Sequence, residues 1–410
     1  MKYTSALYLT YDGLGDQLGP SQITPYLKLI SERVENLYLI SFEKKGDYYF
    51  QELINELPKN IIWKRLQFTN SSNQVAKIYD LLRFIFFANS FLILKKINVI
   101  HARGHVGSFA TFPFLFLLRK VRFIFDYRGM WIDERIDKGL FDTSKFVHKL
   151  EYLFGKKLEV AYLKRANKII VLTNTIKDFF VKECNIPSLK IKVLPCVANF
   201  DSFRYTKNGR KFIREEFNIP NEAFLLGYVG SYGRMYACAD TIKFFRLSLY
   251  RNNVYLLIVS NQVGEWLNAL NQQLDEHEIK RVFIVSSKHS DLYKYLSAMD
   301  LMLALIVPSK ARIASSPTKV GEAFAIGLPV LTNIGVGDLE IDIKKFNAGK
   351  VINIKEINHL KNDTINIKSL LDEVSSRSHI RNSAKANYSF IEAAIPVYDS
   401  LYKLSNKNKN

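Results

Sequence analysis

The sequence alternates short runs of β-branched and apolar residues with longer segments of helical periodicity, and this alternation constrains the fold more than any other feature. It is typical of βαβ units, in which helices connect parallel strands. In the first half, strands are predicted at Ser5–Thr10, Leu37–Phe42, Ile61–Gln67, Asn98–Ala102, Arg122–Tyr127, Lys168–Leu172 and Ile191–Leu194. In the second half, they are predicted at Leu225–Val229, Tyr255–Ser260, Arg281–Val285, Asp300–Leu305 and Pro329–Thr332.

Two doubly wound, Rossmann-like α/β domains facing across a cleft are therefore the predicted architecture. The length of 410 residues agrees with two domains, because single cores rarely grow beyond about 250–300 residues. We place the N-terminal domain at residues 1–200 and the C-terminal domain at residues 201–385, with the aperiodic stretch Pro195–Gly209 as the linker. A last helix is predicted over Arg381–Leu404, and we expect residues 386–410 to pack back toward the N-terminal domain.

The charge of the chain indicates an anionic partner. Lysine and arginine total 58 against 39 aspartate and glutamate, for a formal charge of +19. The basic residues are spread over many predicted helices without a nucleic-acid-binding pattern, so nucleic acid is not an expected partner. The cysteines Cys184, Cys196 and Cys238 form no CxxC pair and have no companion histidines, so neither a disulfide framework nor a metal site is predicted.

The location expected from the sequence is the cytoplasm. The N-terminal residues lack the pattern of a secretion signal, and the most apolar stretches, Phe84–Leu94 and Phe112–Leu118, are shorter than the roughly 20 residues that cross a bilayer. The segment Lys145–Lys168 carries seven Lys or Arg against two Glu and has an apolar face beside its lysines. This pattern fits a helix on the inner, anionic membrane surface or, equally, a solvated helix whose apolar stripe belongs to the core.

The most specific segment runs from Ser315 to Val330. A serine hydroxyl followed by Pro317 predicts a capped helix start, and Gly327 predicts its end. Ser315, Ser316 and Lys319 would thus surround a helix N-terminus that suits a diphosphate, with Glu322 one turn on, where it could hold a ribose diol. The alternative is an ordinary capped helix with a surface glutamate.

Three further segments follow predicted strands. After the strand ending at Val229, Gly230, Ser231 and Arg234 form a flexible turn that could approach a phosphate, or a plain turn with a solvated arginine. In the loop Asp12–Gln22, Gly13, Gly15 and Gln22 belong to a glycine-rich sequence that is one residue too long for GxGxxG.

The third of these segments, Phe125–Glu134, places Asp126 and Arg128 at a strand end, where they suit an acceptor hydroxyl and a phosphate or sugar. A structural salt bridge is the alternative. His101 and His105 follow the preceding predicted strand and are weaker candidates for the same region, since a single histidine there is more often structural.

Together these segments, with YLSAMDLMLAL (Tyr295–Leu305), resemble GT-B glycosyltransferases of family 4, particularly bacterial enzymes of surface-polysaccharide synthesis, over nearly the whole chain. The resemblance implies transfer of a sugar from a nucleotide-sugar to a glycan or lipid-linked acceptor, with retention and without a metal or other cofactor. Gly230, Ser231, Arg234, Ser315, Ser316, Lys319 and Glu322 would bind the donor. Gly13, Gly15, Gln22, His105, Asp126 and Arg128 would bind the acceptor or the transferred sugar, and Asp126, Arg128, Arg234 and Lys319 would serve catalysis.

The chain departs from the family at one position. Many members carry a second glutamate eight positions before the one that matches Glu322, where this chain has Ala314. We therefore expect backbone N–H groups near Gly335–Asp338 or Ser315 to hold the sugar. Two other functions stay open: an NAD-dependent oxidoreductase that uses the glycine loop and Glu43, and a non-catalytic protein that binds a nucleotide-sugar or polyanion.

Overall fold

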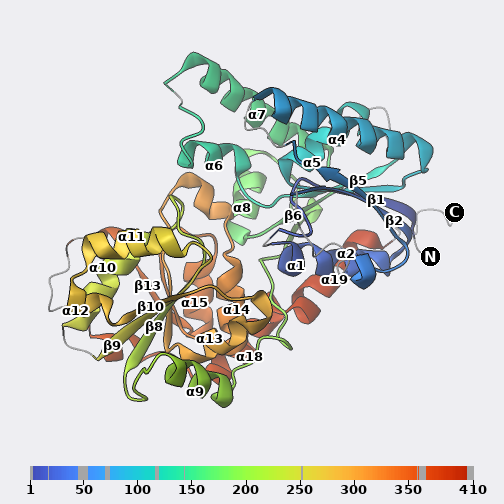
Figure 1. The fold of residues 1–410 in the computed structure, drawn as a ribbon. Helices are drawn as coiled ribbons and strands as arrows, with labels where there is room; N and C mark the ends of the chain where they lie inside the picture. Colours follow the sequence, from blue (N-terminus) through green and yellow to red (C-terminus); the bar gives the residue numbers. More distant parts are fainter. Residues whose placement is uncertain are drawn as a thin grey trace. The chain divides into compact units, whose positions relative to one another are not determined.

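The computed structural model describes residues 3–16, 18–44, 54–69, 74–115, 120–142, 144–250, 253–357, 359 and 366–403, which form two compact units (Figure 1). Unit 1 comprises Met1–Ile136, Phe141–Leu194 and Ala394–Asn410, and unit 2 comprises Asp137–Leu140 and Pro195–Ala393. The main boundary between the units thus lies before Pro195, whereas the sequence placed the domain boundary after residue 200. The short segment Asp137–Leu140 joins unit 2, which the sequence did not indicate.

Unit 1 is built on a parallel sheet of seven strands within the described residues, in the order β3-β2-β1-β4-β5-β6-β7. The strands are β1 (Tyr3–Thr10), β2 (Val34–Glu43), β3 (Ile61–Gln67), β4 (Val99–Arg103), β5 (Arg122–Asp126), β6 (Lys168–Val171) and β7 (Ile191–Val193). The strand order reverses between β1 and β4. In sheets of this type, ligands bind beyond the carboxyl ends of the strands at such a reversal.

Helices cover both faces of this sheet. They are α1 (Gly19–Gln22), α2 (Thr24–Ser31), α4 (Gln74–Leu94), α5 (Gly104–Leu115), α6 (Trp131–Asp137), α7 (Phe146–Arg165), α8 (Asn174–Glu183), the 3-10 helix η1 (Ser188–Lys190) and α19 (Ile395–Tyr402). Figure 1 shows α4, α5 and α7 on one face and α1, α2 and α19 on the other. Within the described residues, no helix is both long and apolar enough to span a membrane.

Unit 2 contains a parallel sheet of six strands within the described residues, in the order β10-β9-β8-β11-β12-β13. The strands are β8 (Phe224–Val229), β9 (Val254–Val259), β10 (Val282–Val285), β11 (Leu301–Ala304), β12 (Val330–Asn333) and β13 (Gly349–Ile352). The helices are α9 (Lys207–Glu216), α10 (Cys238–Leu249), α11 (Val263–Gln273), α12 (Glu276–Ile279), η2 (His289–Asp291), α13 (Leu292–Ala298), η3 (Lys310–Ala314), α14 (Thr318–Ile326), α15 (Leu339–Phe346), α16 (Ile354–Ile357), α17 (Ile367–Leu371), α18 (Arg377–Tyr388) and the π-helix η4 (Phe390–Ala394).

Successive residues of the central strands of unit 2 point into separate cores. Leu225 packs in a core with residues of α9, α13, α14, α15 and α18, whereas Leu226 packs in a core with residues of α10, α11, α16 and α17. This separation follows from the two-residue repeat of a strand, whose side chains alternate between the faces of the sheet. Unit 2 is therefore a doubly wound sheet with helices on both faces.

Two elements of unit 2 were not predicted. The edge strand β13 is short and only half-buried, so it lacks the apolar run of an inner strand, and Gly349 allows it to lie close to Val330. Helix α9 begins inside the predicted linker, because the Thr206 hydroxyl accepts the Gly209 N–H (3.0 Å) and caps the helix.

The single closing helix predicted over Arg381–Leu404 is wrong. Helix α18 ends at Tyr388, and Ser389 is extended because it forms a bridge with Ala198: the Ala198 N–H donates to Tyr388 O (2.9 Å) and the Phe390 N–H donates to Ala198 O (3.0 Å). The chain continues through η4 into α19, which belongs to unit 1. There Tyr398 stacks on Tyr26 of α2, with ring centroids 5.2 Å apart.

Candidate functional site

Helix α14 of unit 2 carries the most specific segment of the sequence. Its N-cap is Pro317, not a serine, so the predicted hydroxyl cap is wrong. The Ser316 hydroxyl instead accepts the Cys196 N–H (3.0 Å), which ties α14 to the start of unit 2. Gly327 ends the helix in the left-handed conformation, as predicted, with φ of 73°.

Glu322 lies buried on α14 within a group of basic side chains. Its Oε1 is 2.9 Å from His289 Nε2, and its Oε2 is 3.0 Å from Lys319 Nζ. Burial alone would raise the pKa of the Glu322 carboxyl, but Lys319 and His289 outweigh it and hold this pKa below its ordinary value. Glu322 is therefore a buried carboxylate with a fixed orientation and not the surface glutamate of the alternative interpretation.

The sequence did not indicate His289. It lies on η2, after the carboxyl end of β10, and it reaches Glu322 from 33 positions away in the chain. Because the strands of unit 2 are parallel, the loops that follow β8, β10, β11 and β12 all belong to the same edge of the sheet. Its position after a strand end could have marked His289 as a candidate site residue. The local sequence, however, does not indicate that this histidine contacts Glu322.

The turn after β8 contains the second predicted donor segment. Gly230 has a φ of 153°, which an L side chain rarely adopts. The Ser231 carbonyl accepts the Tyr228 hydroxyl (2.7 Å), and the next N–H, of Tyr232, donates to Gln262 Oε1 (2.8 Å). Arg234 is exposed at the end of this turn.

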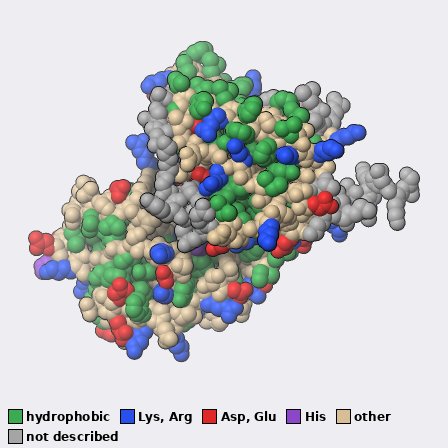
Figure 2. Space-filling model, turned by 45° about the vertical axis from the view of Figure 1, so that its right-hand side comes forward, with side chains coloured by type: hydrophobic (Ala, Val, Ile, Leu, Met, Phe, Trp, Pro, Cys, Tyr) green, Lys and Arg blue, Asp and Glu red, His purple; other side chains and the backbone are tan. Residues whose placement is uncertain are grey.

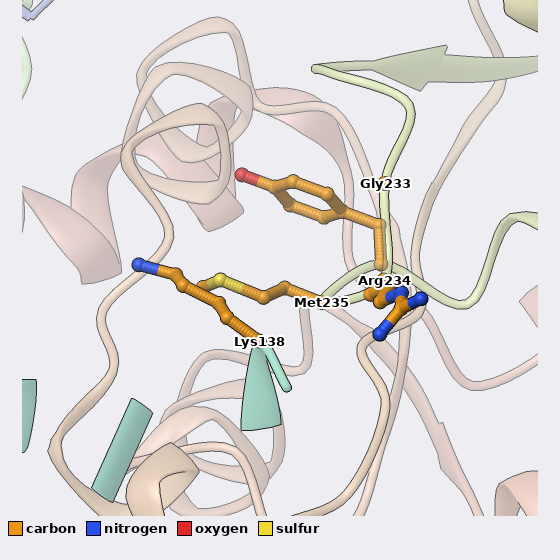
Figure 3. A pocket seen from close by; sticks show the side chains of 5 residues that line it. Lys138, Gly233, Arg234 and Met235 are labelled. Atoms are coloured by element: carbon orange, nitrogen blue, oxygen red, sulfur yellow. The ribbon is translucent and has the colours of Figure 1, made fainter. Parts of the chain in front are cut away.

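A pocket of about 280 Å³ opens beside this turn and is lined by Lys138, Gly233, Arg234, Met235 and Tyr236. Figure 3 shows the Lys138 side chain extending along that of Met235, whereas the Arg234 guanidinium points in another direction. Lys138 was missed from the sequence, because it lies far from the other lining residues along the chain.

Segment Asp137–Leu140 is anchored in unit 2 by a carboxylate. Asp137 Oδ2 accepts the Ser309 hydroxyl (2.6 Å) and pairs with Arg312 Nη2 (2.9 Å). Arg312 is itself buried on η3. A Cβ at Gly139 would meet Arg234 Nη1 at 2.9 Å, so this segment also packs against the arginine at the pocket.

The backbone groups expected to compensate for Ala314 are partly occupied. Ala314 is buried, and the Arg312 carbonyl accepts both the Ser315 N–H (3.0 Å) and the Gly337 N–H (2.8 Å). These two N–H groups hold η3 to the loop after β12. The Ser315 and Gly337 N–H groups are thus already bonded within unit 2, and binding of the transferred sugar by backbone N–H groups of this region stays a prediction.

Unit 1 has a separate cluster of buried charges at the carboxyl ends of β4 and β5. The Asp126 carboxylate lies 3.5 Å from Arg128 Nη1 and 3.6 Å from Arg103 Nη1. His101 Nε2 is 3.7 Å from the same carboxylate. Burial would raise the pKa of Asp126, but Arg128, His101 and Arg103 lower it to about 2.

Among the described residues, neither oxygen of Asp126 accepts a hydrogen bond. Buried carboxylate oxygens almost always have donors, so this corner suits a hydroxyl or water. Arg128 Nη2 donates to Gln22 Oε1 (3.0 Å), which brings the predicted Gln22, Asp126 and Arg128 together. Arg103 adds a buried cation that the sequence did not indicate.

The glycine loop is organised from within unit 1. Glu43 accepts the N–H groups of Leu14 (3.0 Å) and Gly15 (3.3 Å), and Asp16 accepts that of Gly13 (3.0 Å). A Cβ at Gly13 would meet Glu43 Oε2 at 2.6 Å, so glycine permits this close packing. Because Glu43 binds the loop, it is not placed to hold a ribose as the oxidoreductase alternative requires.

His105 lies in a different network from Asp126. Its Nε2 is 2.9 Å from Glu159 Oε2, and Glu159 also accepts the Tyr127 hydroxyl (3.1 Å) and pairs with Lys156. His105 is 6% exposed. The structure therefore places this histidine in an internal network, and its predicted contact with an acceptor stays a prediction. Within the described residues, no group of three His, Cys, Asp or Glu side chains could hold a metal ion.

Comparison with known proteins extends these observations. Residues 209–387, most of unit 2, match the family described as Glycosyl transferases group 1. A curated relative is the UDP-Gal:alpha-D-GlcNAc-diphosphoundecaprenol alpha-1,3-galactosyltransferase of Escherichia coli, 26% identical over 203 residues. That similarity spans about half of each protein, with 47% of this chain and 49% of the relative.

Solved structures are similar over almost the whole chain. A sucrose-phosphate synthase from Thermosynechococcus elongatus has a TM-score of 0.72 at 14% identity and covers 97% of this chain and 99% of its own. Anabaena HepE in complex with UDP and glucose has a TM-score of 0.66 at 14% identity, and the match covers 98% of this chain and 100% of HepE. WaaG, a glycosyltransferase involved in lipopolysaccharide biosynthesis, has a TM-score of 0.65 at 16% identity, and the match covers 96% of this chain and 99% of WaaG. The chain has the GT-B fold.

Proposed function

We propose that this protein is a glycosyltransferase of family 4 that moves a sugar from a nucleotide-diphosphate sugar to a glycan or lipid-linked glycan in surface-polysaccharide synthesis. The observation that carries the proposal is the buried Glu322, oriented by Lys319 and His289, within the segment that matches glycosyl transferases. The named activities of the Escherichia coli relative and of WaaG support the class of donor and acceptor.

The donor is proposed to bind at the carboxyl edge of the unit 2 sheet. Glu322 would accept the ribose hydroxyls, because a fixed carboxylate offers paired acceptors for a diol. The diphosphate would lie between the start of α14 and the turn after β8, where Lys319 and Arg234 supply positive charge. UDP in the HepE structure supports a nucleoside diphosphate as the ligand class.

The acceptor hydroxyl is proposed to bind at Asp126 and Arg128 of unit 1. Asp126 stays ionised at neutral pH because its pKa is about 2, and its oxygens are suited to accept a hydrogen bond from the acceptor hydroxyl. In the proposed reaction, the C1–O bond to the diphosphate breaks as the acceptor oxygen attacks from the same face, with retention. The acceptor proton passes to the leaving diphosphate, whose negative charge the basic side chains stabilise without a metal ion.

We also propose a cytoplasmic location in which Lys145–Lys168 contacts an anionic membrane. A lipid-linked acceptor would be presented at that surface. Helix α7 forms most of this segment, and Phe146, Val147, Leu150, Leu153 and Phe154 on it are exposed. The exposed side chains favour the membrane interpretation over the one in which this stripe belongs to the core.

Ligand-induced stabilisation tests the donor site. We expect UDP, GDP or ADP, or one of their sugars, to raise the melting temperature, since a ligand at 100 times its Kd stabilises by about 2.7 kcal/mol. Glu322→Gln should weaken this shift, and Arg234→Ala should lower the release of nucleoside diphosphate more than it lowers stability. Lys319→Ala is a less specific probe, because it also removes a partner of the buried Glu322.

Lys344→Ala is the matched control, because Lys344 is an exposed cation of α15 that pairs with Glu340 one turn away on the same helix. It should retain the ligand shift and the turnover. The proposal is wrong if no nucleoside diphosphate or nucleotide-sugar stabilises the protein. Stabilisation without transfer or hydrolysis would favour the non-catalytic binding protein.

A further inference from the structure

Helix α4 has an apolar stripe on its exposed side. Its exposed fractions are between 55% and 74% at six large apolar side chains: Val75, Ile78, Tyr79, Leu82, Phe86 and Ile93. These positions recur at spacings of three, four and seven residues, which correspond to one or two helical turns, and therefore lie on one face of the helix. From Val75 to Ile93 the stripe is about 27 Å long at 1.5 Å per residue.

The opposite side of α4 is a normal core face. Phe84, Ala88 and Leu92 are buried there, and α4 packs against α5. The helix is thus apolar on both sides, although a surface helix normally has a polar outer face. Folding within unit 1 does not account for the exposed stripe.

Helix α7 extends the same kind of surface. Helix α5 contacts both α4 and α7, and Figure 1 shows all three on one face of the unit 1 sheet. The exposed apolar residues of α7 have exposed fractions of 47–74%. Figure 2 shows hydrophobic side chains interspersed with Lys and Arg in its upper part, the region in which Figure 1 draws α4 and α7.

The charges around the two stripes have one predominant sign. Exposed lysines on or next to the helices are Lys77, Lys95, Lys96, Lys145, Lys149, Lys157 and Lys164. Of the acidic residues on α4 and α7, Asp80 and Glu159 are buried, and Glu151 is exposed. A second copy of this basic face would meet it with electrostatic repulsion, whereas an anionic lipid surface is complementary to it.

We propose that α4 and α7 together form one docking surface for an anionic bilayer, in which the α4 stripe inserts among the lipid chains and the flanking lysines bind the headgroups. A helix with an apolar face and lysines at its margins lies in the interface plane in this way. The surface extends the membrane contact of Lys145–Lys168 proposed above, but it rests on exposed side chains and not on the transfer reaction.

Vesicle binding by the full chain tests this surface. We expect binding to phosphatidylcholine vesicles that contain phosphatidylglycerol, weaker binding at high salt, and little binding to phosphatidylcholine alone. The double variant Phe86→Ser/Ile93→Ser should lower the partition coefficient by about tenfold or more. Lys149→Gln should lower it by about fivefold, as expected when one lysine near an anionic surface loses its charge.

Ile341→Ser is the matched control. Ile341 is 61% exposed on α15 of unit 2 and is not part of the proposed surface, so its loss should leave vesicle binding unchanged. The variants remove exposed side chains only, so their melting temperatures should equal that of the parent protein. Equal melting temperatures with reduced binding would assign the loss to the surface.

Three outcomes would overturn the inference. The first is wild-type vesicle binding by Phe86→Ser/Ile93→Ser, with loss only in the α7 variant Leu150→Ser/Phe154→Ser; membrane contact through Lys145–Lys168 would then stand without α4. The second is equal binding to neutral vesicles. The third is a protein that forms a dimer in sedimentation and does not bind vesicles, when the α4 variant dissociates that dimer. This face would then be an interface between copies of the chain.

Nucleotide stabilisation is measured separately, so failure of the proposed donor site would leave this result unaffected.

Discussion

At the scale of single residues, Glu159 holds together a buried network that includes His105, a residue predicted to bind the acceptor. The carboxylate pairs with His105 and Lys156. Burial would raise its pKa, but these partners lower the pKa to about 2. The stability that this network contributes is fully present above the ordinary pKa of a glutamate in the unfolded chain.

We therefore expect Glu159→Gln to lower the free energy of unfolding by about 3 kcal/mol at neutral pH, because a buried partner is removed. The sign of the pH dependence follows from the lowered folded pKa. The stability due to Glu159 should be lost as pH falls from about 4.5 toward 2, so the variant should show a flatter acid limb. Urea unfolding at several pH values checks this. Glu151→Gln, an exposed change on α7, should match the parent protein.

Residue types near a strand end were predictable, but their partners were not. Lys319 and Glu322 are neighbours on one helix, so their pairing follows from local spacing. His289 and Lys138 join their groups only through the tertiary fold. The predicted serine cap failed for the opposite reason: the distant Cys196 N–H competes for the Ser316 hydroxyl.

At the scale of elements, the end of α14 determines where Glu322 and Lys319 lie. Gly327 has a φ of 73°, and a Cβ there would lie 2.0 Å from the Arg377 carbonyl oxygen. The backbone of α18 thus occupies the space that any larger residue needs. At Gly264, near the start of α11, a Cβ would meet no neighbouring atom within 4 Å in the described part of the chain.

We expect Gly327→Ala to lower the free energy of unfolding of unit 2 by about 2–4 kcal/mol, because left-handed strain and a backbone clash add together. Gly264→Ala should leave stability unchanged or raise it by up to about 1 kcal/mol, since alanine is the better helix former. Thermal and denaturant unfolding of the two variants measures the difference. Equal stability of both would show that α18 adapts to the added methyl group.

At the scale of the whole molecule, the chain crosses between its units more than once. Asp137–Leu140 belongs to unit 2, and α19 returns to unit 1 after the break at Ser389. In unit 1, Tyr402 Oη lies 2.9 Å from His101 Nδ1, and Asp399 pairs with Arg33. The last helix is therefore part of the core of the first unit.

We expect Tyr398→Ala to lower the stability of unit 1 by about 3–5 kcal/mol, because a buried aromatic ring is removed. Hydrogen exchange measured by mass spectrometry should show faster exchange in β1 and β4 and little change in β8 and β11. Tyr250→Ala, at an exposed position of unit 2, should change neither. Uniformly faster exchange in both units would indicate that they unfold together.

The sequence by itself determined the parallel strands, the two doubly wound units and the segments after the strands, because these depend on periodicity and turn chemistry between near neighbours. The tertiary structure decided where the last helix breaks, which groups orient Glu322, and that His105 faces Glu159. It also decided that the apolar stripe of α4 is exposed, since a sequence pattern cannot tell a covered apolar face from an open one. Such properties depend on residues that are distant in the chain and meet only when the unit that contains them has folded.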